Sequence, residues 1–408
     1  MLSSEDYSFT WDKMTWYREE ICNLFAICTI PSPNLVVIRE TLEGMRNTQH
    51  KGLKLRNEKF DQPLHAVCLA YSEGGGSLEL IKHMIELYPE SIMSRNGDGY
   101  LPINCACKGN APLEVIKYLI EKDTSTIKDH RGTFTRTPLQ WACIQGASLE
   151  VIQHLVEQWP ESIRYANRSR PFDYPLHCAC ENGAKPGVIQ YLVEKWWVAL
   201  AITTETYGRL PLHKACMAVT PLQLQDIQCM VERYPDALQQ KDTENEATPL
   251  NCACGTGVTS VGVIPYLVEQ WPESVKIPDI NGLLPLHNAC WGTSRYYTHD
   301  RESGFESRTT LDDIQILVQQ WPESVRHPFV RKMGDGKSPR LTTKRDFKKM
   351  SIRTRPIYIA WHTREPDDDD LINWLDLPWR RASRRSFVRP PETRRRLHIY
   401  LTDGHMLR

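Results

Sequence analysis

The chain has 408 residues, of which 41% are hydrophobic, and its 50 Lys and Arg balance its 50 Asp and Glu. At this length a single compact core is excluded unless the fold grows linearly, because globular cores stop growing at about 250–300 residues. The most apolar stretch, Trp196–Ile202, is too short to span a bilayer, and Met1–Asp6 lacks the basic and apolar regions of a secretory signal. We therefore expect a soluble cytoplasmic or nuclear protein with no membrane span.

The net charge of zero hides an asymmetry between two parts of the chain. Residues 331–408 contain 20 Lys and Arg against 10 Asp and Glu, whereas residues 1–330 contain 30 against 40. Charge complementarity therefore predicts basic partners for the acidic part and anionic partners for the basic part.

One short motif returns seven times. The first copy reads Pro63-Leu64-His65-Ala66-Val67-Cys68 and the last reads Pro285-Leu286-His287-Asn288-Ala289-Cys290. The other copies begin at Pro102, Pro138, Pro175, Pro211 and Pro249. The final cysteines of successive copies lie 36 to 39 residues apart. A period of this length is typical of a stacked repeat array.

A second pattern follows each copy. An apolar pair is followed four positions later by another pair, as in Val151-Ile152 and Leu155-Val156. This spacing draws one apolar stripe along an α-helix. We expect that helix to end near the aromatic residue of Trp159-Pro160-Glu161-Ser162, because proline disfavours the α region for the residue before it. The equivalent aromatic residues in other units are Tyr88, Tyr234, Trp271 and Trp321.

Each unit is therefore predicted to contain a short first helix, a tight turn, a second helix and a return loop. Glycine marks several of the tight turns, for example Gly109 and Gly183, and Asn96-Gly97-Asp98-Gly99 has the composition of a return loop. Two helices of about ten residues cannot bury their apolar faces alone, so consecutive units must stack on one another.

These motifs resemble the ankyrin repeat, whose consensus places Thr-Pro-Leu-His-x-Ala-Ala after an Asp-x-x-Gly turn. Thr137-Pro138-Leu139, Thr248-Pro249-Leu250 and the four copies with His match it best. The chain departs from the family pattern in its Cys for the second Ala, its period above about 33 residues and its Trp-Pro-Glu-Ser endings. The resemblance implies an all-α, ankyrin-type helix-turn-helix repeat solenoid. It also implies a non-catalytic scaffold or adaptor that binds other proteins through its turn tips and the concave face of its first helices.

Two degenerate units are expected to close the array, so that it has about nine units in all. The upstream unit contains Leu24–Cys28 and the downstream unit contains Pro356–Trp361. We divide the chain into an N-terminal lead (1–15), an array of one cap and seven repeats (16–326), a basic linker or loop (327–355), a C-terminal capping repeat (356–378) and an Arg-rich tail (379–408). Residues 291–310 form an insertion, either a plain loop or a contact segment.

The 13 cysteines favour packing over chemistry. One column at the repeat period contains Cys28, Cys68, Cys107, Cys143, Cys180, Cys216, Cys254 and Cys290. A small apolar side chain between stacked helices accounts for this column. The Cys-x-Cys pairs cannot chelate one ion from a helix, because positions two apart do not face each other. We expect reduced thiols, no metal and no cofactor.

The recurring histidines also favour a structural role. His65, His177, His213 and His287 share one position, which Asn104, Gln140 and Asn251 occupy in other copies. All these side chains can bridge backbone groups of adjacent loops, whereas Asn cannot replace a general base. The chain has no phosphate loop, nucleophile elbow, kinase signature or zincin motif. We therefore expect no catalytic residues and no enzymatic activity.

Two sets of residues are candidates for binding. The repeat register places on the surface the partner-binding candidates Asp98, His130, Arg131, Trp141, Tyr207, Lys214, Asn281 and Asn288. The tail candidates are Arg380, Arg381, Arg384, Arg385, Arg394, Arg395 and Arg396. Such basic clusters serve in nuclear localisation, nucleic-acid binding or anionic-surface contact, or remain solvated with no target. The sequence thus predicts a monomeric protein-binding scaffold, or alternatively an adaptor whose tail binds nucleic acid or an anionic surface.

Overall fold

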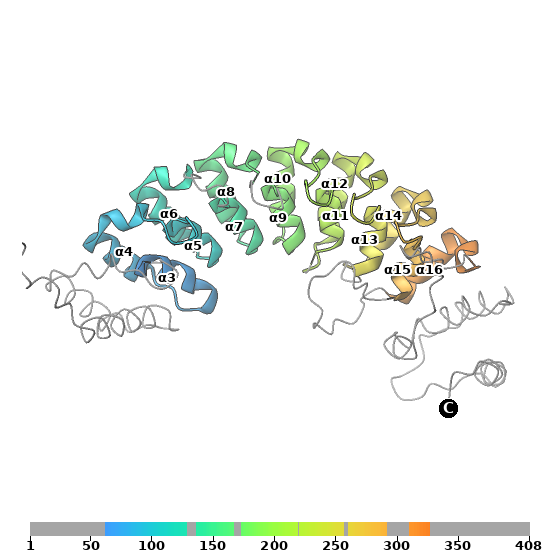
Figure 1. Ribbon diagram of the computed structural model, residues 1–408, viewed down its shortest axis with the longest axis horizontal. Coiled ribbons are helices and arrows are strands. Elements are labelled where there is room, and N and C mark those ends of the chain that lie inside the picture. The colour runs from blue at the N-terminus through green and yellow to red at the C-terminus, as the bar shows by residue number, and fades with distance from the viewer. Residues whose placement is uncertain are drawn as a thin grey trace, which may run out of the picture. The chain divides into compact units, whose positions relative to one another are not determined.

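The computed structural model describes residues 62–128, 136–166, 173–218, 220–256, 260–291 and 310–326. In these ranges the regular structure is helical, with no strand, and it consists of seven helix pairs (Figure 1). Each pair is a first helix and a second helix, followed by a short 3₁₀ turn. The predicted all-α helix-turn-helix repeat is confirmed. The two predicted capping units lie outside the described residues.

The first helices all begin at the proline of the repeated motif. They are α3 (Pro63–Leu69), α5 (Pro102–Lys108), α7 (Pro138–Ile144), α9 (Pro175–Asn182), α11 (Pro211–Cys216), α13 (Pro249–Thr256) and α15 (Pro285–Trp291). Proline suits this first position because its missing N–H would have no partner there. The residue before it is extended, as at Thr137 with φ −68° and ψ 159°, because the proline ring excludes the α region.

The second helices carry the predicted apolar stripe. They are α4 (Leu78–Leu87), α6 (Leu113–Lys122), α8 (Leu149–Gln158), α10 (Val188–Lys195), α12 (Leu224–Arg233), α14 (Val263–Gln270) and α16 (Leu311–Gln320). In α8 the stripe residues Val151, Ile152, Leu155 and Val156 are all buried. Burying one such side chain stabilises the fold by about 1.5–3 kcal/mol.

The Trp-Pro-Glu-Ser motif forms the end of a second helix and the 3₁₀ turn after it. The 3₁₀ turns that follow second helices span Pro89–Met93, Thr124–Lys128, Pro160–Arg164, Trp197–Ala201, Pro235–Gln239, Pro272–Lys276 and Pro322–Arg326. At Trp271 the backbone leaves the helix with φ −145° and ψ 84°. The Ser274 hydroxyl then donates to the Trp271 carbonyl at 2.6 Å. The motif therefore stops the helix and satisfies one of its last free carbonyls.

Burial of the aromatic residues in this motif differs from unit to unit. Trp159 is buried, with 7% of its surface exposed. Tyr88, Tyr234, Trp271 and Trp321 are only half-buried. The sequence pattern therefore predicted their place at the helix end correctly but could not predict how deeply each one is buried.

Two turn glycines allow adjacent units to approach closely. A Cβ at Gly109 would lie 2.6 Å from the Cys68 carbonyl oxygen of the preceding unit. Gly183 ends α9 with φ 71°, and a Cβ there would lie 2.2 Å from the Thr220 carbonyl oxygen. Only glycine fits both requirements, because other residues would clash with backbone or adopt a strained left-handed conformation.

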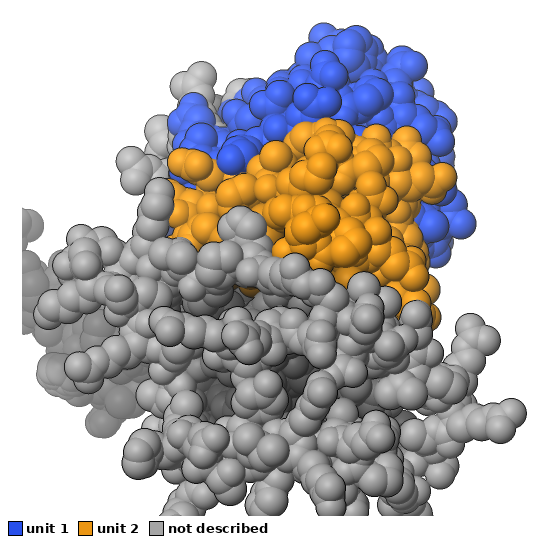
Figure 2. Space-filling view, turned by 90° about the vertical axis from the view of Figure 1, so that its right-hand side faces the viewer, with its two compact units in different colours: residues 1–244 blue, residues 245–408 orange. Residues whose placement is uncertain are grey.

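The chain divides into two compact units, residues 1–244 and 245–408, which Figure 2 shows in different colours. In the first unit, α3, α5, α7, α9 and α11 pack on one another in chain order, and α6, α8, α10 and α12 form a second row. In the second unit, α13 packs against α15 and α14 packs against α16. Each unit thus has its own two rows of helices.

Candidate functional site

The His column joins each unit to the next return loop. His213 Nδ1 accepts a hydrogen bond from the Leu210 N–H at 3.2 Å, and its Nε2 lies 3.2 Å from the Gln240 carbonyl oxygen. His65 is buried and bonds backbone groups in the same way. His177 is also buried, and its Nε2 lies 3.0 Å from the Ile202 carbonyl oxygen. His287 Nδ1 accepts a hydrogen bond from the Leu284 N–H at 2.9 Å. Both ring nitrogens are occupied by backbone in a residue such as His213, which leaves no free nitrogen for proton transfer.

Asn and Gln make equivalent bridges in the other units. Gln140 Oε1 accepts from the Thr137 N–H at 2.8 Å, and its Nε2 donates to the carbonyl oxygens of Tyr165 and Asp173 at 3.1 and 2.7 Å. Asn104 Nδ2 donates to the Arg136 carbonyl at 3.1 Å. The shared geometry explains why either an amide or an imidazole side chain can occupy this position.

The Cys column lies inside the stack of first helices. Cys107, Cys143, Cys180, Cys216 and Cys254 are free thiols with at most 2% of their surface exposed. Burial raises the pKa of Cys216 to about 12 and raises that of Cys180 well above its ordinary value. Such thiols stay protonated, and the thiolate is the reactive and metal-binding form. The side chain of Cys290 lies outside the described part of the structure. Among the described residues no group of three His, Cys, Asp or Glu is placed to hold a metal ion.

The structure corrects the expected exposure of three partner-binding candidates. Asp98 is exposed in a return loop, and Tyr207 and Asn281 are half-buried. Trp141, Lys214 and Asn288 were expected on the surface, but they are buried, with 8%, 4% and 1% of their surface exposed. Their shared position in the first helix is covered by the adjacent unit, which a pattern within one repeat does not reveal. His130, Arg131 and all seven tail arginines lie outside the described residues.

Trp141 is the centre of an aromatic and cationic cluster. Its ring contacts that of Tyr100 edge-on, with centroids 5.7 Å apart. The Lys108 ammonium lies 5.0 Å from the indole centroid, and the Arg136 guanidinium carbon lies 5.1 Å from it. Burial raises the pKa of Tyr100, so its phenol stays neutral. We call Tyr100, Lys108, Arg136 and Trp141 the Trp141 cluster.

Lys214 occupies the same repeat position as Trp141, two units further along, and is the centre of an ion-pair cluster. Its Nζ lies 3.1 Å from Asp173 Oδ1 and 2.8 Å from Glu181 Oε2. Burial alone would lower the pKa of Lys214, but the charges of Glu181 and Asp173 outweigh burial and raise it. Burial also raises the pKa of Asp173, and the Lys214 charge opposes that effect. The lysine is charged and its charge is matched by the chain itself.

A third cluster surrounds Arg209. Its Nε lies 3.3 Å from Asp242 Oδ2, and it also pairs with Glu244. The guanidinium carbon lies 4.8 Å from the ring centroid of Tyr207. This arrangement ties the return loop before α11 to the next return loop and places Tyr207 beside a paired cation.

The sequence analysis did not identify several members of these clusters. Tyr100, Arg136, Asp173 and Arg209 all lie two residues before the proline of the motif. Their shared position relative to the motif proline could have identified them from the sequence, because it places each residue beside the first helix of its own unit. Lys108 and Glu181 lie toward the other end of their first helices, each four residues after the column residue of its own unit.

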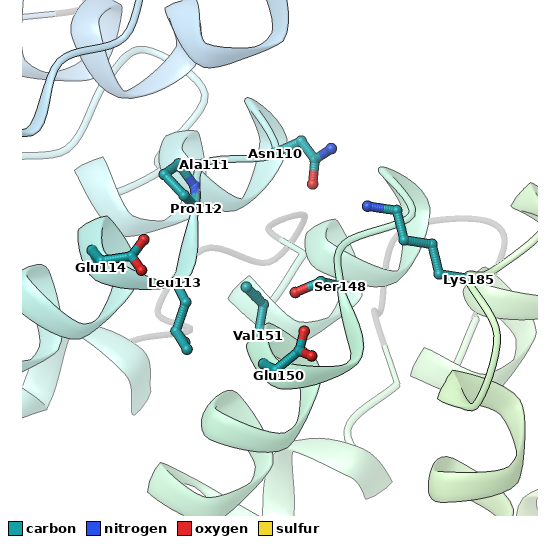
Figure 3. A pocket seen from close by; sticks show the side chains of 9 residues that line it. All are labelled: Asn110, Ala111, Pro112, Leu113, Glu114, Ser148, Glu150, Val151 and Lys185. Atoms are coloured by element: carbon teal, nitrogen blue, oxygen red, sulfur yellow. The ribbon is translucent and has the colours of Figure 1, made fainter.

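A shallow recess of about 380 Å³ lies on another face, where the turn before α6 meets the start of α8 (Figure 3). Its lining includes Asn110, Glu114, Ser148, Glu150 and Lys185. The pKa of Glu150 is lowered by hydrogen bonds from its own backbone N–H and from the Ser148 hydroxyl, as is usual for an acid at a helix start. The recess mixes two carboxylates with one ammonium, and these charges define no ligand class.

Comparisons with known proteins agree with the fold. Residues 64–167 match the family model described as ankyrin repeats (3 copies). Residues 64–167 therefore contain ankyrin repeats, and the resemblance inferred from the motifs is confirmed. Ankyrin repeats are generally protein-interaction modules and are typically non-catalytic. No curated protein matches the sequence. In the described ranges, no helix is both long enough and apolar enough to cross a membrane.

Two solved structures are similar to the chain at low identity. One is the human ASB11 ankyrin repeat domain, at 14% identity and a TM-score of 0.42, covering 62% of this chain and 96% of that one. The other is one chain of the structure of the predatory endopeptidase Bd0816 from Bdellovibrio bacteriovorus in complex with immunity protein Bd3460. It has 18% identity and a TM-score of 0.37, covering 50% of this chain and 93% of that one. At these scores neither structure carries an argument about function.

Proposed function

We propose that this protein is a non-catalytic scaffold or adaptor whose first helices and return-loop tips bind other proteins. The observation that supports this proposal is the variation at one repeat position among otherwise regular units. The position three residues after the motif proline is Ala66, Cys105, Trp141, Cys178, Lys214, Cys252 and Asn288 in the seven successive units. The final Cys of the motif repeats in every unit, whereas this position and the one two residues before the proline change in size and charge. A common frame with variable side chains is how repeat proteins acquire binding specificity.

The partner-binding surface in this proposal includes the exposed Asp98 and the half-buried Tyr207 and Asn281. In this proposal, the buried side chains of Trp141, Lys214 and Asn288 pack beneath that surface and support it. His130 and Arg131 belong to the same set by register. The binding of several partners by one monomer follows from the length of the array.

The test is to identify the proteins that co-purify from cell extract with the full chain. Three variants are compared with it: Asp98→Arg in a return loop, Glu157→Arg on the exposed side of α8, and a chain ending at residue 376. We expect Asp98→Arg to lose specific partners and Glu157→Arg, an exposed charge reversal of the opposite row, to keep them. Equal partner lists for both charge reversals would contradict the proposed surface.

The Arg-rich tail supports a second candidate function, an adaptor that also binds nucleic acid or an anionic surface. This function is supported only by the sequence, which contains two pairs and one triplet of arginine between Arg380 and Arg396. Phosphate-driven binding falls steeply with salt. A nuclease-sensitive interaction that weakens steeply with salt and is lost from the chain ending at residue 376 would support this function. Identical binding by both chains would argue against it.

A further inference from the structure

The Trp141 cluster gathers two cations around one buried ring, from segments that are far apart in the sequence. Lys108 ends α5, and Arg136 precedes α7 by two residues. Both side chains are half-buried, so each is in contact with solvent on one side. Their charged ends lie 5.0 and 5.1 Å from the Trp141 centroid. Two cations therefore contact the same ring, and both attract an anion that approaches it.

No carboxylate of the described residues lies within ion-pair distance of either cation. Lys214, in the same column, differs in this respect, since Asp173 and Glu181 lie 3.1 and 2.8 Å from its ammonium. Arg136 influences the pKa of Asp173 from a distance, but that carboxylate already pairs with Lys214. In the described part of the chain, the charge of Lys214 is thus matched internally, whereas Lys108 and Arg136 have no carboxylate within ion-pair distance.

Other cations also lie over rings, but their setting is different. Lys122 Nζ lies 5.2 Å from the Tyr118 ring, and Lys195 Nζ lies 5.4 Å from the Tyr191 ring. In both pairs the two residues are one turn apart on a second helix, and the lysine is exposed. Water solvates these ammonium groups fully, and such i, i+4 pairs are common on helix surfaces. They supply matched controls for the Trp141 cluster.

A cation over a ring keeps its N–H donors for a further partner. The ring attracts the charge through its quadrupole, and the guanidinium group of Arg presents a fork of donors that matches a carboxylate. Half-burial strengthens such a pair, because fewer water molecules compete for the donors. The half-buried Tyr100 ring offers apolar surface beside the two cations. The cluster therefore has the parts needed to hold an acidic side chain next to an apolar one.

We propose that the Trp141 cluster is the docking point for an acidic segment of a partner protein, whose carboxylates pair with Lys108 and Arg136. This proposal rests on the proposed function and makes it more specific. Residues 1–330 carry a net negative charge. The Trp141 cluster is locally positive, so it would bind a negatively charged segment. The cluster therefore favours an acidic partner, whereas the net negative charge of the array favours basic partners at other positions.

The test uses the full chain and a photo-crosslinkable peptide of alternating Glu and Gly, with the Gln and Gly peptide as its uncharged counterpart. Fluorescence anisotropy measures binding, and mass spectrometry maps the cross-links. The positions of the cross-links distinguish binding at the Trp141 cluster from binding at the Arg-rich tail, which can also attract a polyanion. The variants are Lys108→Glu, Arg136→Glu and the control Lys122→Glu, which reverses a lysine charge over a ring in the same unit.

We expect cross-links to residues near Tyr100 and Trp141 with the Glu peptide and none there with the Gln peptide. Lys108→Glu and Arg136→Glu should each reduce the yield of these cross-links by about tenfold or more, as for the reversal of one partner in a half-buried charge pair. Lys122→Glu should keep the yield within about twofold. Circular dichroism of each variant checks that the helices are intact.

Four outcomes would overturn the proposal. Cross-links confined to residues 379–408, or equal losses in Lys122→Glu and Arg136→Glu, would show that the peptide responds only to general charge. If proteins captured from extract are kept by both Lys108→Glu and Arg136→Glu yet lost by Asp98→Arg, the acidic docking point fails while the proposed scaffold function stands. Loss of no protein in any of these variants would contradict both.

Discussion

Lys214 in α11 reaches back to Asp173 before α9 and forms an ion pair of 3.1 Å between side chains that are 4% and 5% exposed. Glu181 completes the contact from the end of α9 at 2.8 Å. A buried charge of this kind is stable only while its partner is present, because the low-dielectric interior solvates a lone ion poorly. The pair therefore ties two neighbouring units together through charge as well as packing.

Replacing Lys214 with Met should destabilise this part of the array by about 3–5 kcal/mol, because Asp173 would remain buried without its cation. The double variant Lys214→Met with Asp173→Asn should recover most of that loss, since it removes the lone charge. The free energy of unfolding in urea measures both effects. Equal destabilisation in the single and double variants would show that the lysine acts by packing alone.

The stability of the repeat that contains His177 should fall in mild acid. Burial, with the nearby Lys214 charge, lowers the pKa of His177 to about 3. An unfolded His has a pKa of about 6.5, so below that pH the unfolded chain binds a proton that the folded chain does not. Above pH 6.5 neither state binds it, and the effect vanishes. Between pH 7 and 5.5 the free energy of unfolding should therefore fall by about 1.3 kcal/mol because of this residue.

The matched variant for this test is His177→Asn, since Asn104 and Asn251 occupy the same column. Its free energy of unfolding should change less with pH than that of the natural chain, by about the 1.3 kcal/mol calculated for His177. Denaturant unfolding at the two pH values gives the comparison. If both proteins lose stability equally, another group is responsible for the acid sensitivity.

Replacing Cys180 with Asp should destabilise the array by several kcal/mol, on the order of 3–5. Cys180 is fully buried, and its thiol lies 3.7 Å from the Met230 sulfur, so a carboxylate there would have no polar partner. The neighbouring change Glu181→Asp should cost less than about 1 kcal/mol, because that side chain is 48% exposed. Similar shifts of the urea midpoint in the two variants would show that the column register is wrong.

The column thiols should resist alkylation while the protein is folded. Burial raises the pKa of Cys143 and Cys180 well above the ordinary value and that of Cys216 to about 12, so the reactive thiolate is scarce. Cys229 is partly exposed and should react faster. Iodoacetamide labelling followed by peptide mass spectrometry gives the rate at each site with and without urea. Fast labelling of Cys180 in the native protein would indicate frequent local opening of the stack.

Truncation of the helix-end aromatic residues should have unequal effects. Trp159→Ala should cost about 3–5 kcal/mol, the range for deleting a large buried side chain. Trp271→Ala should cost clearly less, because Trp271 is half-buried. Thermal unfolding of the two variants compares them directly. An equal fall in melting temperature in both variants would mean that the contribution of this aromatic residue to stability does not depend on its exposure.

The repeat motif alone determined most of the fold. Proline at each first-helix start, the apolar pairs of each second helix and the aromatic-proline ending act over a few residues, so each can be recognised from local sequence. Because these signals recur at a constant spacing, they also predict that the units stack. The small Cys column follows from the same pattern, since large side chains would not fit between first helices.

Only the tertiary structure decided which of the variable residues act together. Lys214 is expected to be exposed from its own repeat, yet its partner Glu181 lies 33 residues earlier and covers its charge. Trp141 likewise obtains Lys108 from the preceding unit and Arg136 from its own loop. Such contacts depend on how side chains of adjacent units meet, which no period within one unit encodes. The sequence by itself determined the frame of each repeat, and packing between units determined which charges are matched by other described residues of the chain.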